Sequence, residues 1–168
     1  MRLATGSTAP PLQSSDYLGT PVELAQLRGK AVLVSFYRYA SCPICNLRVH
    51  ELIVAHPTLR DLGLEMIAVF QSPAAVIADY VGTQHPPFAI VPDPELALYR
   101  RFRIESRLGA MLSWQVIRRA FKAFASGFRP GRVDGPFGRV PADFLIDADG
   151  QIAIAHYGEN IDDHLAIA

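Results

Sequence analysis

The fold of this chain is decided by residues 31–45, which read AVLVSFYRYASCPIC. The first seven of these residues form a continuous β-branched and aromatic run, which is typical of a strand that is covered on both faces. Pro43 suits the first turn of a helix, where the missing N–H of proline has no helical partner to lose. We therefore expect a buried central strand that leads directly into a helix, with Cys42 and Cys45 at the junction.

The residues that follow repeat the alternation of strand and helix. Apolar side chains recur at helical spacing as far as Leu62, and Gly63 is expected to end the helix. Residues 64–70 then predict a second buried strand, and Ser72-Pro73 opens a helix that runs to about Thr83. A strand–helix–strand–helix unit joins parallel strands, so the pattern indicates an α/β fold.

Shorter elements are expected on both sides of this unit. Residues 1–28 predict a lead-in hairpin, and the Asp149-Gly150 turn predicts a second hairpin near the end of the chain. Further expected elements are a strand at 88–91, a helix at 95–102, strands at 144–147 and 152–157, and a final helix from Asn160 or Asp162. Residues 105–138 predict a helical insertion, with a basic amphipathic helix from Ser113 to Phe124 and a Gly- and Pro-rich loop after it.

Size and composition limit the classes of function. The 168 residues suit one domain spanning 1–168, and 16 basic residues balance 16 acidic ones, so nothing indicates a nucleic-acid partner. No apolar stretch is long enough to span a bilayer, and the amino terminus does not resemble a secretion signal, so we expect a cytoplasmic protein. The sequence has no Gly-x-Gly-x-x-Gly motif after a strand, so it gives no indication of a dinucleotide-binding site. We expect no bound cofactor.

The chemistry is expected at the only two cysteines, Cys42 and Cys45. The start of a helix stabilises thiolates through its unpaired N–H groups and its dipole, and a thiolate is the reacting form of cysteine. Residues three apart in the first turn are close enough for a reversible disulfide. The motif therefore predicts a dithiol redox site.

The cysteine pair has two other interpretations. Buried and unreactive thiols would suit a hydrophobic core, but two of them around a helix-start proline would be an unusual coincidence. A structural zinc site needs about four ligands, and the five histidines show no paired ligand spacing, so we expect no metal.

The sequence also resembles the peroxiredoxin-like branch of the thioredoxin fold, the alkyl hydroperoxide reductase and thiol-specific antioxidant superfamily. The resemblance covers most of the chain except about 105–138 and lies in Gly6 to Pro10, Gly19 to Leu24, Leu27 to Lys30, Val32 to Tyr37, Pro92 to Pro94 with Tyr99, and Phe144 to Gly150. It implies a thioredoxin-like fold with a central mixed β-sheet flanked by helices. It also implies reduction of hydroperoxides through a cysteine thiolate.

The family's site pattern is only partly present. Typical members follow Phe-Tyr with Pro, three residues, Thr, two residues and the peroxidatic Cys, which places Arg38 at the Pro position and Cys42 at the Thr position. Cys45 then occupies the peroxidatic position. Pro141 resembles instead the proline that thioredoxin-like disulfide oxidoreductases hold in cis opposite their dithiol.

Two mechanisms follow. In a peroxidase, the resemblance implies that Cys45 attacks the peroxide, Cys42 forms the disulfide, and a thioredoxin-type dithiol restores both, with Arg38 or Arg139 stabilising the thiolate. In a disulfide oxidoreductase the roles reverse, because Cys42 precedes the helix and is the more exposed, and Pro141 would contact the disulfide substrate.

A third interpretation is a non-enzymatic binding protein, for which residues 114–132 supply both basic and aromatic side chains. They could meet an anionic partner or a membrane surface. The more ordinary expectation is a helix whose aromatic side packs inward while its charges face water. A homodimer is a further possibility that the sequence leaves open.

Overall fold

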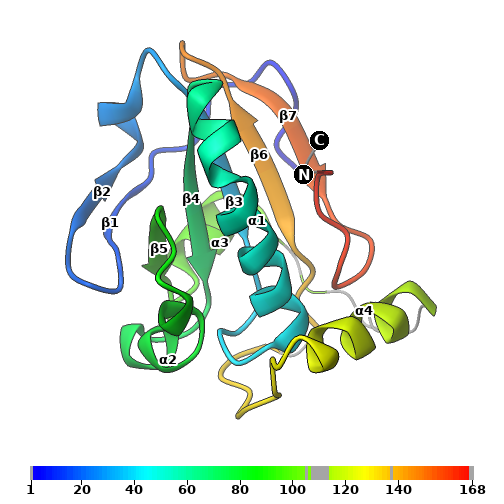
Figure 1. Cartoon of the computed structure of the whole chain (residues 1–168). Helices are drawn as coiled ribbons and strands as arrows, with labels where there is room; N and C mark the ends of the chain where they lie inside the picture. Colours follow the sequence, from blue (N-terminus) through cyan, green and yellow to red (C-terminus); the bar gives the residue numbers. More distant parts are fainter. Residues whose placement is uncertain (1, 105, 107–113, 137, 167–168) are drawn as a thin grey trace.

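The computed structural model describes residues 2–104, 106, 114–136 and 138–166. Its centre is a five-stranded sheet in the order β5-β4-β3-β6-β7 (Figure 1). β3, β4 and β5 are parallel, whereas β6 and β7 run antiparallel. The strands are β3 (Ala31–Phe36), β4 (Leu64–Phe70), β5 (Ala89–Pro92), β6 (Ala142–Ile146) and β7 (Ile152–Tyr157). This mixed sheet confirms the predicted thioredoxin-like α/β class.

Helices cover both faces of the sheet. Figure 1 shows α1 crossing one face and α3 lying behind the strands. The helices are α1 (Pro43–Asp61), α2 (Ala74–Asp79), α3 (Ala97–Arg101) and α4 (Trp114–Ala125), with 3-10 turns η1 (Leu24–Leu27) and η2 (Val81–Gln84). A separate antiparallel pair, β1 (Gln13–Ser15) and β2 (Pro21–Glu23), forms the expected lead-in hairpin. Of the described helices, none is long and apolar enough to cross a membrane.

The central strand is buried because its two sides belong to two different hydrophobic clusters. Val32, Val34 and Phe36 pack toward α3, whereas Leu33 packs against the cluster beneath α1, which also holds Tyr37 and both cysteines. The hydroxyl of Tyr99 on α3 donates hydrogen bonds to the backbone carbonyls of Tyr37 and Val69, at 2.7 and 3.1 Å. One side chain thus joins the carboxyl ends of β3 and β4, next to the loop that carries Cys42.

The predicted final helix from Asn160 or Asp162 is wrong, because the described residues after β7 form turns. The Asn160 side chain accepts a hydrogen bond from the backbone N–H of Asp162 at 3.0 Å, and Asp163 accepts one from Glu159 at 2.7 Å. Short polar side chains that bind nearby backbone groups in this way compete with helix formation. Asp143 and His164, a buried pair at 3.0 Å, fasten the segment to β6.

The insertion helix forms where it was expected, although the predicted first residue, Ser113, lies outside the described residues. The expected orientation is wrong. Trp114 and Phe121 are 71% and 77% exposed, whereas Arg119 is bonded to Glu51 and Asp162. The acidic side chains on α1 and in the C-terminal segment hold the basic side of α4 inward, so its aromatic side faces water.

Candidate active site

The two cysteines lie at the start of α1, as the sequence predicted. Cys42 is the residue before the helix, with extended backbone, and Cys45 lies in the first turn after Pro43. Both are free thiols and both are 2% exposed. The backbone N–H of Cys42 donates to Tyr39 and its carbonyl accepts from Asn46, so the Cys42 backbone is held on both sides.

Arg38 supplies a buried positive charge beside Cys42. Its side chain is 1% exposed, and its Nη1 lies 3.8 Å from the Sγ of Cys42. The guanidinium also lies over the ring of Tyr39, 4.9 Å from the centroid. Because a buried cation favours a neighbouring anion, this geometry stabilises Cys42 as a thiolate.

The two thiols differ in acidity. A hydrogen bond from the Cys45 thiol, the charge of Arg38 and the backbone N–H groups of Cys45 and Ile44 lower the pKa of Cys42 to about 7, although burial opposes this. Burial raises the pKa of Cys45, and its hydrogen bond to Cys42 adds to the effect. Near neutral pH Cys42 is therefore partly ionised, whereas Cys45 keeps its proton.

The loop in front of Cys42 is held by residues that the sequence did not single out. Ser72, which follows β4, accepts a hydrogen bond from the N–H of Ala40 at 2.7 Å and donates to Asp134 at 2.8 Å. The hydroxyl of Ser41 donates to the carbonyl of Arg132 at 2.7 Å. These contacts join segments far apart in the sequence, and no motif marks them. The insertion loop thereby helps to position Cys42.

A largely apolar cavity of about 260 Å³ opens beside Cys42. Its residues are Arg38, Tyr39, Cys42, Pro43 and Ile44 on one side and Val116, Ala120, Phe124, Pro130 and Ile161 on the other. Cys42 lines this cavity, whereas Cys45 does not. A small molecule in the cavity would meet the thiolate of Cys42 first.

The other two predicted supporting residues lie elsewhere. The Arg139 guanidinium donates to the carbonyl of Ile104 at 3.1 Å and lies over the ring of Tyr99, so its described contacts do not include either cysteine. Pro141 is buried, and its carbonyl accepts from the N–H of Gly158. The peptide bond before Pro141 is trans, so the expected cis-proline is wrong. Pro141 therefore no longer supports the hypothesis that the protein is a disulfide oxidoreductase.

A buried dithiol at the start of a helix, on a mixed sheet of this topology, defines a thioredoxin-fold thiol protein. The family model described as "AhpC/TSA family" matches residues 5–155, and the chain belongs to that family. Its relatives indicate that it is a thiol peroxidase.

Individual relatives are distant in sequence but similar along most of the chain. A Mycobacterium tuberculosis protein that is named as a peroxiredoxin is 24% identical over 165 residues, covering 98% of this chain and 92% of its own length. The crystal structure of peroxidoxin BcpB from the same organism has a TM-score of 0.71 at 16% identity, covering 96% and 90% of the two chains. Peroxiredoxin Q of Xanthomonas campestris has a TM-score of 0.66 at 20% identity, with 90% and 87% coverage.

Proposed function

We propose that this peroxidase uses Cys42 as the attacking thiolate and Cys45 as the resolving thiol. The observation that supports this order is that Cys42 lines the cavity with Arg38 beside it, while Cys45 lies behind it with a raised pKa. This order is the reverse of the one that the family resemblance implies. The order follows from the position of each sulfur relative to the cavity and to Arg38, which is the only arginine among the described residues that line the cavity.

In the first step the Cys42 thiolate attacks the terminal oxygen of a hydroperoxide. The S–O bond forms as the O–O bond breaks, the peroxide is reduced, and Cys42 is oxidised to a sulfenic acid. The leaving alkoxide, or hydroxide from hydrogen peroxide, takes up a proton and departs as an alcohol or water. The Arg38 guanidinium lies within reach of the charge that moves from sulfur to the leaving oxygen.

In the second step the Cys45 thiol attacks the sulfenic sulfur of Cys42. A disulfide forms, the S–O bond breaks, and water leaves with the proton of Cys45. Both cysteines lie in one chain and one helical turn, so this step needs no second copy of the protein. A thioredoxin-type dithiol in the reducing cytoplasm would restore the pair by thiol–disulfide exchange.

Single-cysteine variants test the order directly. The reduced protein is treated with sub-stoichiometric hydrogen peroxide, and the state of each thiol is followed by alkylation and mass spectrometry. We expect an internal disulfide in the wild type, a trapped sulfenic acid on Cys42 in Cys45→Ser, and slow oxidation in Cys42→Ser.

Two other outcomes would contradict the proposal. Wild-type rates of sulfenic acid formation on Cys45 in the Cys42→Ser variant would contradict the proposed order. Slow reaction with peroxide combined with fast exchange with a disulfide would indicate a disulfide oxidoreductase.

A further inference from the structure

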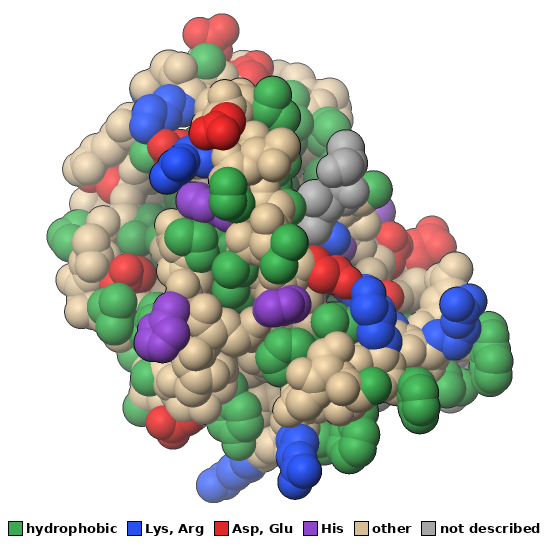
Figure 2. All heavy atoms as spheres, in the orientation of Figure 1, with side chains coloured by type: hydrophobic (Ala, Val, Ile, Leu, Met, Phe, Trp, Pro, Cys, Tyr) green, Lys and Arg blue, Asp and Glu red, His purple; other side chains and the backbone are tan. Residues whose placement is uncertain are grey.

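α4 exposes a continuous row of large apolar side chains. Trp114, Ile117, Phe121 and Phe124, here termed the α4 stripe, follow one another at helical spacing and are 71%, 58%, 77% and 61% exposed. Figure 2 shows hydrophobic side chains standing out from the surface over α4, with Lys and Arg beside them. A row of this kind marks an interaction surface, because isolated exposed apolar side chains are ordinary but contiguous ones are not.

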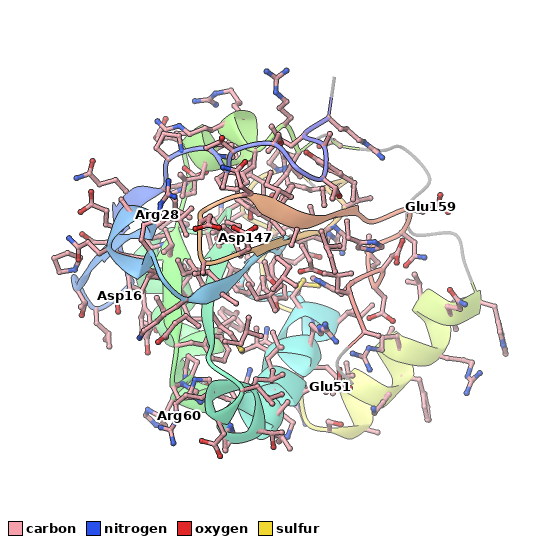
Figure 3. All side chains as sticks on the ribbon, turned by 90° about the horizontal axis from the view of Figure 1, so that it is seen from above. Asp16, Arg28, Glu51, Arg60, Asp147 and Glu159 are labelled. Atoms are coloured by element: carbon pink, nitrogen blue, oxygen red, sulfur yellow. The ribbon has the colours of Figure 1, made fainter. Side chains whose placement is uncertain are left out.

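The contacts of α4 fix the stripe in its outward position. The Arg119 guanidinium is bonded to both carboxylate oxygens of Glu51, and its Nε lies 2.8 Å from Asp162. The Nζ of Lys122 lies 3.1 Å from Glu51, which Figure 3 shows on the part of α1 nearest α4. On the inner side of the helix, Val116 and Ala123 are buried. The stripe therefore faces outward as part of the folded structure.

Part of the basic charge of α4 is neutralised, because Arg119 and Lys122 pair with Glu51 and Asp162. α4 carries Arg118, Arg119 and Lys122 and no acidic residue. Arg118 is exposed and has no ion pair among the described residues, and the loop that follows adds the exposed Arg129 and Arg132. A helix with Trp and Phe on one face and Lys or Arg along its edge is typical of helices that lie in the interface of an anionic bilayer.

We propose that the α4 stripe docks on an anionic lipid bilayer. The apolar side chains would enter the boundary between headgroups and acyl chains, and the exposed Arg118, Arg129 and Arg132 would meet the lipid phosphates. A second copy of this chain fits less well, because two stripes packed together would also bring together the basic edges of both helices.

Trp114 is the only tryptophan of the chain, so its fluorescence reports on the stripe alone. The full-length protein is mixed with phosphatidylcholine vesicles with or without phosphatidylglycerol, and emission and co-sedimentation are measured. We expect a blue shift and binding with the anionic vesicles, both weakened by salt. Phe121→Ser should lower binding by at least about tenfold, since it removes one large buried side chain from the interface.

Leu18→Ser is the matched control, because Leu18 is 74% exposed but lies in the β1–β2 hairpin. It should bind as the wild type does, and thermal unfolding should show that both variants fold. Absence of binding to anionic vesicles, equal binding to neutral ones, or a blue shift that depends on protein concentration without lipid would overturn the docking proposal. The last outcome would instead identify a second copy as the occupant.

Discussion

The guanidinium of Arg38 lies 3.8 Å from the sulfur of Cys42, and both side chains are buried. A buried arginine can remain charged here because its neighbour is the residue that becomes an anion. The ring of Tyr39 covers part of the guanidinium and contributes a second favourable contact. Arg38 is thus positioned to stabilise the thiolate of Cys42.

Replacing Arg38 with Met should raise the pKa of Cys42 by about 1 or more, because one nearby opposite charge is lost. From a starting pKa of about 7, the thiolate fraction at pH 7 would fall several-fold. The check is the pH dependence of Cys42 alkylation, with the modified peptide identified by mass spectrometry. Arg139→Met is the matched control, since Arg139 is also a buried arginine but contacts Tyr99 and Ile104. Equal shifts in the two variants would contradict a direct role for Arg38.

The rate of reaction with peroxide should rise with pH through about 7, the pKa of Cys42. Below this value the thiol is protonated and unreactive, and above it the thiolate is fully formed. Stopped-flow measurement of the second-order rate constant checks the expectation. An inflection only well above pH 7 would mean that the more weakly acidic Cys45 is the attacking residue.

Ser and Ala at position 45 should have different effects on Cys42. The Cys45 thiol donates a hydrogen bond that lowers the pKa of Cys42, and a serine hydroxyl can still donate one, whereas alanine cannot. We expect the pKa of Cys42 to rise more in Cys45→Ala than in Cys45→Ser. Titration of the Cys42 thiolate by its ultraviolet absorbance gives both values. The same pKa in the two variants would exclude this hydrogen bond as a cause.

Ser72→Ala should destabilise the protein and loosen the loop before Cys42. The N–H of Ala40 would lose its buried acceptor, a change that costs about 1–3 kcal/mol. Ser72→Thr keeps a hydroxyl at the same place and should retain more of the stability. Urea unfolding measures the difference, and hydrogen exchange at Ala40 shows whether the loss is local. Unchanged protection of that amide would contradict the role of Ser72.

Asp143→Asn should lower the free energy of unfolding by about 3 kcal/mol at neutral pH, because it leaves His164 without its buried carboxylate. Burial raises the pKa of Asp143, but His164, Ser35 and the N–H of Leu165 outweigh it, so the net shift is downward. A lowered carboxyl pKa means that this stability is present above about pH 4 and is lost on further acidification.

The exposed pair Lys30–Glu65 supplies the control for Asp143. Lys30→Gln should change stability by less than about 1 kcal/mol, because exposed ion pairs contribute little. Equal losses in the two variants, measured by denaturant unfolding, would show that burial of the Asp143–His164 pair has no special effect.

Local patterns in the sequence were sufficient for the central strand, the helix that begins at Pro43 and the dithiol at their junction. Strand and helix periodicity are properties of neighbouring residues, which is why these elements were predicted closely. The turn at Asp149-Gly150 was predictable for the same reason, since Gly150 adopts the positive φ of 77° that glycine tolerates. The expectation of one domain over 1–168 stays a prediction.

What could not be predicted depends on contacts between distant residues. The amphipathic pattern of α4 showed that the helix has an apolar side, but Glu51 and Asp162 decide that the opposite side faces α1. The family pattern put Cys45 at the peroxidatic position, but the cavity beside Cys42 depends on Val116 and Phe124, which lie about 75 residues further along the chain. Ser72 and Asp134 likewise meet near Cys42 only in the folded protein.

The hydroxyl of Tyr99, placed between the carbonyls of Tyr37 and Val69, limits how the protein can move during a catalytic cycle. The ends of β3 and β4 cannot separate without breaking these contacts. We therefore expect a rearrangement that accompanies a disulfide between Cys42 and Cys45 in the loop between β3 and α1 and in the first turn of α1, which carries Cys45. The oxidised and reduced forms should therefore share the same pairing of β3 with β4.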